Sequence, residues 1–143
     1  MTPDRIESHV RALYEGTPLD DPSWSPALRF SDPLVLVEGE RAVLAMFERL
    51  ARWVPETRVL RCEPLVGPGG DIARWALEVD WRRSMRGGGM RLRSMLDVQV
   101  EGDAIAGLTE HWRAPLLMDG APTGALRTRL RRAFGRWSAR PVG

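Results

Sequence analysis

Three consecutive segments between Asp71 and Arg113 alternate between apolar and polar residues, and this pattern constrains the fold more than any other feature of the chain. A period of two residues is typical of β-strands with one buried face, so the segments predict an antiparallel sheet. The positions predicted to face inward are Trp75, Leu77, Val79, Trp81, Leu96, Val98, Val100, Ala106, Leu108, Glu110 and Trp112. Bulky indole rings with one acid among them favour a pocket for an apolar small molecule.

Turn and helix signals divide the rest of the chain. Thr2 and Pro3 predict a helix start, and Gly16 with Pro18 predicts its end. A second helix is expected between Gly39 and Pro55. The predicted strands are 28–31, 35–38, 57–66, 72–83, 90–101 and 104–115, and an amphipathic helix at 125–140 follows a linker at 119–124. This order predicts an α+β protein with its helices on one face of a strongly bent sheet.

Composition limits the class of protein. A chain of 143 residues with 43% hydrophobic residues is expected to form one globular unit. One cysteine, Cys62, allows no internal disulfide, and no signal peptide or transmembrane run is recognised, so a cytoplasmic location is expected. All 21 basic residues are arginine, and six of them lie in residues 121–143, which hold no acid. The chain therefore combines an acidic body with a basic tail.

Three short motifs, in this order and spacing, resemble the nuclear transport factor 2-like superfamily. They are Ser31-Asp32-Pro33 before Val37-Glu38-Gly39, the hairpin Glu101-Gly102-Asp103-Ala104-Ile105, and the strand end Thr109-Glu110-His111-Trp112-Arg113. The superfamily includes SnoaL-like polyketide cyclases, ketosteroid isomerases and limonene-epoxide hydrolases. The resemblance covers about residues 3–116. It implies a cone-shaped, antiparallel-rich sheet curved around the N-terminal helices (residues 1–118), followed by the linker and basic helix (residues 119–143).

The resemblance places two acids at the expected site. Asp32 lies where ketosteroid isomerases carry their general base, although an Asp before Pro is also a common turn former. Glu110 lies where epoxide hydrolases carry an acid on the last strand. It is either an inward general acid, or a solvated or arginine-paired carboxylate at the strand end. Asp97 lies nearest to the second oxyanion acid of ketosteroid isomerases, but its strand parity predicts an outward side chain unless a bulge turns it inward. The Arg and Asp of the epoxide hydrolases fall at Leu77 and Val79, and Asp80 has the outward parity, so the epoxide-hydrolase triad is absent and the isomerase set is partial.

His9 and Tyr14 compete for one role on the first helix. Either side chain would stabilise a developing oxyanion, and the alternative for both is a hydrogen-bonded core residue. The predicted ligand-lining residues are Phe47, Trp75, Leu77, Val79, Trp81, Leu96, Val98, Leu108 and Trp112. The two histidines have no metal-ligand spacing, so no metal and no cofactor are expected.

The predicted pocket and the family resemblance also imply the binding partners. We expect an apolar small-molecule ligand, no nucleic acid, and a homodimer through the outer sheet face. Helix 125–140 is expected to pack on the cone or on a partner subunit, and a peripheral contact with an anionic membrane stays open. The predicted function is a cofactor-independent isomerase or cyclase acting on a carbonyl-bearing polyketide, steroid or terpenoid. Epoxide hydrolysis is less favoured, and the alternative is a non-catalytic ligand-binding or protein-interaction module of the same fold.

Overall fold

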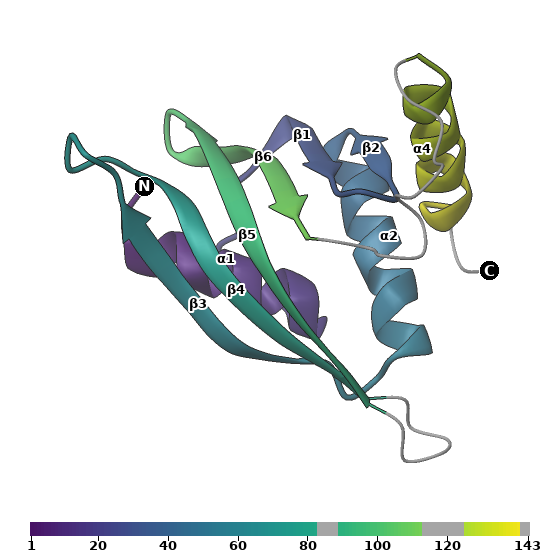
Figure 1. Ribbon diagram of the computed structural model, residues 1–143, viewed down its shortest axis with the longest axis horizontal. Helices are drawn as coiled ribbons and strands as arrows, with labels where there is room; N and C mark the ends of the chain where they lie inside the picture. Colours follow the sequence, from purple (N-terminus) through teal and green to yellow (C-terminus); the bar gives the residue numbers. More distant parts are fainter. Residues whose placement is uncertain (83–88, 113–124, 141–143) are drawn as a thin grey trace.

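A computed structural model describes residues 1–82, 89–112 and 125–140 (Figure 1). Helices and strands alternate in the first half, and hairpin-connected strands dominate the second. The elements are α1 (Pro3–Glu15), β1 (Trp24–Ser31), β2 (Leu36–Glu38), α2 (Glu40–Trp53), β3 (Arg58–Val66), β4 (Ile72–Arg82), β5 (Gly89–Glu101), β6 (Ala104–His111) and α4 (Ala125–Ser138). The α+β class expected from the sequence is confirmed.

The strands form one open sheet in the order β2-β1-β6-β5-β4-β3. The β1–β6 pair is parallel and the other pairs are antiparallel. Long strands β3, β4 and β5 bend across the molecule with α1 behind them, and α2 lies beside β1 and β2 (Figure 1). The sheet therefore curves around the two N-terminal helices, as predicted.

Strand alternation sets the core. Trp75 of β4, Leu96 of β5 and Glu110 of β6 are direct neighbours in the pairing register, so they lie in one row on the concave face. The predicted inward residues Trp75, Leu77, Val79, Leu96, Val98 and Leu108 are all buried in one hydrophobic cluster. Burial of side chains of this size is the main favourable contribution to folding.

Two strand predictions are corrected by the pairing register. β1 begins at Trp24 and not at Leu28, because Trp24 pairs with Ile105 of β6 despite the nearby prolines. A register shift between Trp24 and Arg29 accommodates Pro26 within the strand. A second shift lies between Gln99 and Val100, and it leaves Val100 exposed on the sheet although its parity predicted burial.

The C-terminal helix packs through a different face from the predicted one. Phe134 and Trp137 are 47% and 42% exposed, whereas Gly135 and Ser138 are buried. The helix lies against β2 at Gly135, where a residue without a side chain allows a close approach, and it meets α2 through the ring of Trp137 beside Trp53. The linker at 119–124 and the end of the predicted strand 104–115 lie outside the described residues. None of the described helices has the length and apolar character needed to cross a membrane.

Candidate active site

Three side chains from three elements meet at a buried carboxylate. The Tyr14 hydroxyl of α1 donates a hydrogen bond of 2.5 Å to Oε2 of Glu110 on β6. The Ser94 hydroxyl of β5 donates one of 2.7 Å to Oε1 of the same residue. Glu110 is only 4% exposed, so these hydroxyls supply the donors that water would otherwise provide. Glu110 therefore points inward, which decides between the two positions considered for it.

Burial gives this cluster a high affinity for protons. It raises the pKa of Glu110, and the hydrogen bonds from Tyr14 and Ser94 lower that pKa without cancelling the effect. Burial, followed by the nearby Glu110 charge, raises the pKa of Tyr14 well above its ordinary value. Tyr14 thus remains a hydrogen-bond donor at neutral pH, and Glu110 holds its proton to a higher pH than an exposed carboxyl group does.

Asp32 is both a turn former and an available carboxylate. Its Oδ1 accepts hydrogen bonds from the backbone N–H groups of Leu34 and Val35, both at 2.7 Å. No donor from the described part of the chain reaches its other oxygen, Oδ2. Burial raises the pKa of Asp32, although the two backbone hydrogen bonds and the Arg131 charge lower it. The Asp32 charge also raises the pKa of Tyr14 and of Glu110, which places Asp32 within electrostatic range of both.

His9 has a different position from Tyr14. Its Nδ1 lies 2.7 Å from the carbonyl oxygen of Arg5, and its Nε2 accepts a hydrogen bond of 2.9 Å from the backbone N–H of Ser23. These partners require the hydrogen on Nδ1. The ring is buried and packs edge-on against Trp24. Both nitrogens are therefore occupied by the backbone, and of the two candidates it is Tyr14 that contacts Glu110.

Asp97, on the opposite strand face, points away from this cluster, as expected. Asp97 accepts two hydrogen bonds from Arg74, of 2.6 and 2.9 Å, and lies 2.8 Å from Nε2 of His111. The Arg74 guanidinium lowers the pKa of Asp97. Asp80 pairs in register with Arg58 and Arg91 and is buried. The homodimer expected through this face stays a prediction.

Two residues of the site were not predicted from the sequence. Ser94 has the same parity as Leu96 and Val98, so alternation alone could have placed it on the concave face. Arg131 of α4 reaches the turn that carries Asp32, with hydrogen bonds to Ser31, Asp32 and Val35. No periodicity in the basic tail indicates that contact.

The predicted ligand-lining side chains stand in the core around these polar groups. Phe47 contacts the rings of Tyr14 and Phe30, each at 5.0 Å between centroids. Trp81 packs against the core and Trp112 is partly buried just beyond β6. That they line a ligand pocket stays a prediction.

Two hollows are lined by described residues on the helical side. The larger, of about 740 Å³, lies between α1, α2 and the loop that joins α1 to β1, with Leu13, Trp24, Leu44 and Phe47 in its wall. A hollow of this volume is large enough for a small molecule. Phe47 also contacts Tyr14, whereas neither Asp32 nor Glu110 lines this groove.

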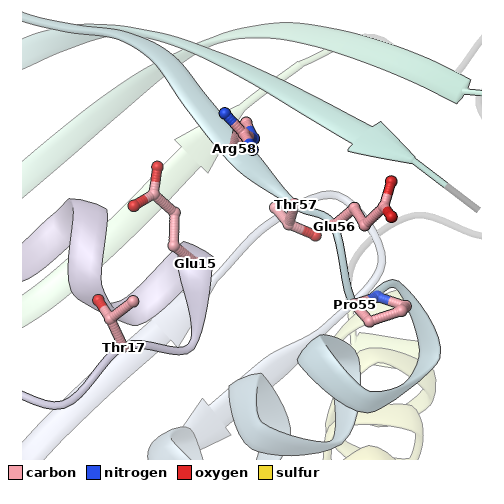
Figure 2. A pocket seen from close by; sticks show the side chains of 6 residues that line it. All are labelled: Glu15, Thr17, Pro55, Glu56, Thr57 and Arg58. Carbon is pink, nitrogen blue, oxygen red and sulfur yellow. The ribbon is translucent and has the colours of Figure 1, made fainter. Parts of the chain in front are cut away.

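The smaller hollow, of about 460 Å³, lies between the end of α1 and the start of β3. Figure 2 shows Glu15 and Thr17 on one side of it and Pro55, Glu56, Thr57 and Arg58 on the other. None of the candidate acids lines it.

Metal and thiol chemistry receive no support from the described residues. Within residues 1–82, 89–112 and 125–140, no group of three or more His, Cys, Asp or Glu side chains is arranged to hold a metal ion. Cys62 is buried, and burial raises its pKa to about 12, so it remains a thiol.

The curved sheet and its buried acid cluster define a cone-shaped α+β protein, and solved structures share this architecture. An NTF2-like protein from Anabaena variabilis ATCC 29413 matches with a TM-score of 0.60 and 13% identity, over 78% of this chain and 85% of that one. A putative SnoaL-like polyketide cyclase from Jannaschia sp. CCS1 matches with a TM-score of 0.58 and 15% identity, over 92% and 96%. The epoxide hydrolase/cyclase-like enzyme SalBIII, of pyran ring formation in salinomycin, matches with a TM-score of 0.59 and 14% identity, over 77% and 88%.

The chain therefore has the nuclear transport factor 2-like fold, and the resemblance stated from the sequence is confirmed at the level of the fold. No family model matches the sequence, and no curated protein matches it.

Proposed function

We propose that this protein is an acid/base isomerase or cyclase that acts on an apolar, carbonyl-bearing small molecule. The observation that carries the proposal is the pairing of two kinds of group in one buried region. Asp32 offers a carboxylate oxygen with no donor among the described residues, and Tyr14 with Glu110 offers protons held by groups of raised pKa. Proton transfer at carbon requires one group that accepts the proton and another that stabilises the negative charge that develops.

The reaction begins with a proton on a carbon next to the substrate carbonyl. Oδ2 of Asp32 accepts this proton, and the electron pair of the broken C–H bond moves onto the carbonyl oxygen. Glu110 in its protonated form donates a hydrogen bond to the Tyr14 oxygen, so that the single hydrogen of the Tyr14 hydroxyl is donated to the resulting enolate oxygen. In an isomerase, Asp32 returns the proton to a different carbon. In a cyclase, the enolate carbon attacks a second carbonyl of the same molecule, and the new alkoxide takes the proton.

The surroundings of the acids support an apolar ligand with hydrogen-bond acceptors. The concave face is built from aromatic and aliphatic side chains. Among its members, Trp75 and Trp81 each have a buried indole N–H with no hydrogen-bond partner in the described structure. A buried donor without a partner is costly, and a ligand carbonyl or hydroxyl would satisfy it.

The structural neighbours support the class and leave the substrate open. One is a putative SnoaL-like polyketide cyclase and another an epoxide hydrolase/cyclase-like enzyme. Both names describe those proteins, and at 14–15% identity their likeness shows a shared fold. The proposal for this chain depends on its own acids.

Deuterium exchange tests the proposal without knowledge of the natural substrate. Ketones of three kinds (a β,γ-unsaturated steroid ketone, an aromatic polyketone and a terpenoid ketone) are incubated with the protein in D₂O, and exchange at the α-carbon is followed by NMR. We expect protein-dependent exchange with at least one ketone class. It should fall about 100-fold or more in Asp32→Asn, the loss typical of a general base.

Asp97→Asn is the matched control, because it makes the same chemical change on the outer face of the sheet. Its exchange rate should stay close to that of the wild type. Ketones that bind without any exchange would contradict the proposal and favour the non-catalytic ligand-binding module. Exchange that survives in Asp32→Asn would contradict the role of Asp32.

A further inference from the structure

One arginine of the C-terminal helix is built into the turn that carries Asp32. The Arg131 Nη2 group donates hydrogen bonds to Oγ of Ser31 at 2.5 Å, to the carbonyl oxygen of Asp32, and to the carbonyl oxygen of Val35 at 3.1 Å. These three acceptors span the whole connection between β1 and β2. The contact joins positions about 100 residues apart in the sequence.

Close packing of the α4 backbone against β2 brings Arg131 within reach of the Asp32 turn. A Cβ added to Gly135 would lie 2.4 Å from the carbonyl oxygen of Leu36, so the helix backbone lies directly against β2 there. Arg131 precedes Gly135 by one helical turn and lies on the same face. At the other end, Arg49 of α2 donates a hydrogen bond to the carbonyl oxygen of Arg140. Figure 1 shows α4 beside β2 and α2.

The charges around Asp32 come from three elements. Arg131 of α4 is the cation, and its charge favours the ionised carboxylate. Tyr14 of α1 and Glu110 of β6 lie within electrostatic range of Asp32, and each of the two is disfavoured as an anion by the Asp32 charge. Arg131 therefore offsets part of the cost of holding a second acid in this buried region.

We propose that Arg131 is a positioning residue of the candidate active site: it fixes the Asp32 turn through three hydrogen bonds and supplies the positive charge beside the Asp32 carboxylate. The C-terminal helix then contributes a residue to the candidate active site. The role in turnover rests on the function proposed above, whereas the effect on Asp32 itself is measured without any substrate.

The test is a carbon NMR titration of the side-chain carboxyl groups, with the Asp32 signal assigned from its absence in Asp32→Asn. We expect the Asp32 midpoint to move to higher pH in Arg131→Met, because the neighbouring cation is lost. Arg131→Lys keeps the positive charge but loses the planar guanidinium group, so the Asp32 midpoint should move less than in Arg131→Met. Amide hydrogen exchange at Leu34 and Val35 should speed up in both variants, because the turn loses hydrogen bonds from Arg131.

Arg132→Met is the matched control. Arg132 is the next residue of the same helix, is about half exposed, and lies 3.8 Å from the Glu38 carboxylate, its one acidic neighbour among the residues that the structure describes. It should leave the Asp32 midpoint and both amides unchanged. An unchanged midpoint in Arg131→Met, with the folded spectrum retained, would overturn the proposal. An equal change in Arg132→Met would overturn it too.

The two proposals fail in different experiments. If no ketone exchanges deuterium but Arg131→Met still moves the Asp32 midpoint, the proposed function is wrong and the role of Arg131 beside Asp32 stands. If exchange occurs, its pH profile in Arg131→Met should move in the same direction as the Asp32 midpoint. A profile that stays in place would contradict the positioning role.

Discussion

The Tyr14 hydroxyl and the Glu110 carboxylate, 96 residues apart in the sequence, share a hydrogen bond of 2.5 Å in the protein interior. The bond joins α1 to β6, so it crosses from the helical layer to the sheet. It also links two protonation equilibria, because it lowers the pKa of Glu110 and raises that of Tyr14. A change at either residue is therefore expected to be measurable at the other.

Tyr14→Phe tests this coupling through stability. Among the described residues, the variant leaves Glu110 with the Ser94 hydroxyl as its remaining donor, so the pKa of Glu110 should rise further. A buried acceptor that loses its partner costs about 1–3 kcal/mol. We expect a loss of that order in the free energy of urea unfolding at pH 8, and a smaller loss where Glu110 is protonated. Thr109→Val removes a hydroxyl from the neighbouring position of β6 and serves as the control; a loss for Tyr14→Phe that is equal at all pH values would contradict the coupling.

Glu110→Gln should change how stability depends on pH. The folded protein raises the pKa of Glu110, so between the ordinary carboxyl pKa, about 4.3, and the raised value, the folded state binds more protons than the unfolded chain. The free energy of unfolding contributed by this group therefore falls as pH increases through that window. The Gln variant lacks this contribution, and its profile from pH 4.5 to 8 should be flatter than that of the wild type.

Urea midpoints at each pH measure the effect. Glu101→Gln, at an exposed position of the β5–β6 hairpin, is the matched control. Parallel profiles for the wild type and Glu110→Gln would show that Glu110 has no raised pKa in the folded state.

Asp32→Ala and Asp32→Asn should separate the two roles of this residue. Asn keeps an Oδ1 acceptor for the N–H groups of Leu34 and Val35, so the turn should be retained. Ala loses both hydrogen bonds, which we expect to cost about 1–3 kcal/mol in unfolding free energy. Deuterium exchange should be lost in both variants, whereas thermal unfolding should distinguish them. Equal stability of the two would mean that the side chain does not hold the turn.

The alternation of apolar and polar residues in the sequence correctly predicted which face of the sheet several strand residues occupy. Alternation placed Trp75, Leu77 and Val79 in the core and Asp97 on the outer face, because parity is a property of a single strand. It could not choose between His9 and Tyr14. Both lie on the buried face of α1, and the choice depends on partners elsewhere: the Ser23 backbone for one, Glu110 for the other.

The C-terminal helix shows the limit of such predictions. Its aromatic stripe predicted burial of Phe134 and Trp137, yet these residues are exposed and Trp137 contacts Trp53 and Arg49 near the surface. The buried face is set by the available surface of β2, where only a residue without a side chain fits against Leu36. The buried face of a helix cannot be predicted from the helix sequence alone, because it depends on the shape of the surface against which the helix packs.

Gly135→Ala tests that close approach. Alanine favours an isolated helix by about 1 kcal/mol over glycine, so propensity alone predicts a more stable protein. The added Cβ would lie 2.4 Å from the Leu36 carbonyl oxygen and 2.9 Å from Cγ2 of Val37, and backbone cannot move aside cheaply. We therefore expect a net loss of about 1–3 kcal/mol, the usual cost of overpacking. The exchange of Ala133, an exposed residue of the same helix, for glycine calibrates the propensity effect in unfolding experiments. A stabilised Gly135→Ala protein would mean that α4 does not lie against β2 as described, and the contacts of Arg131 with the Asp32 turn would then lose their support.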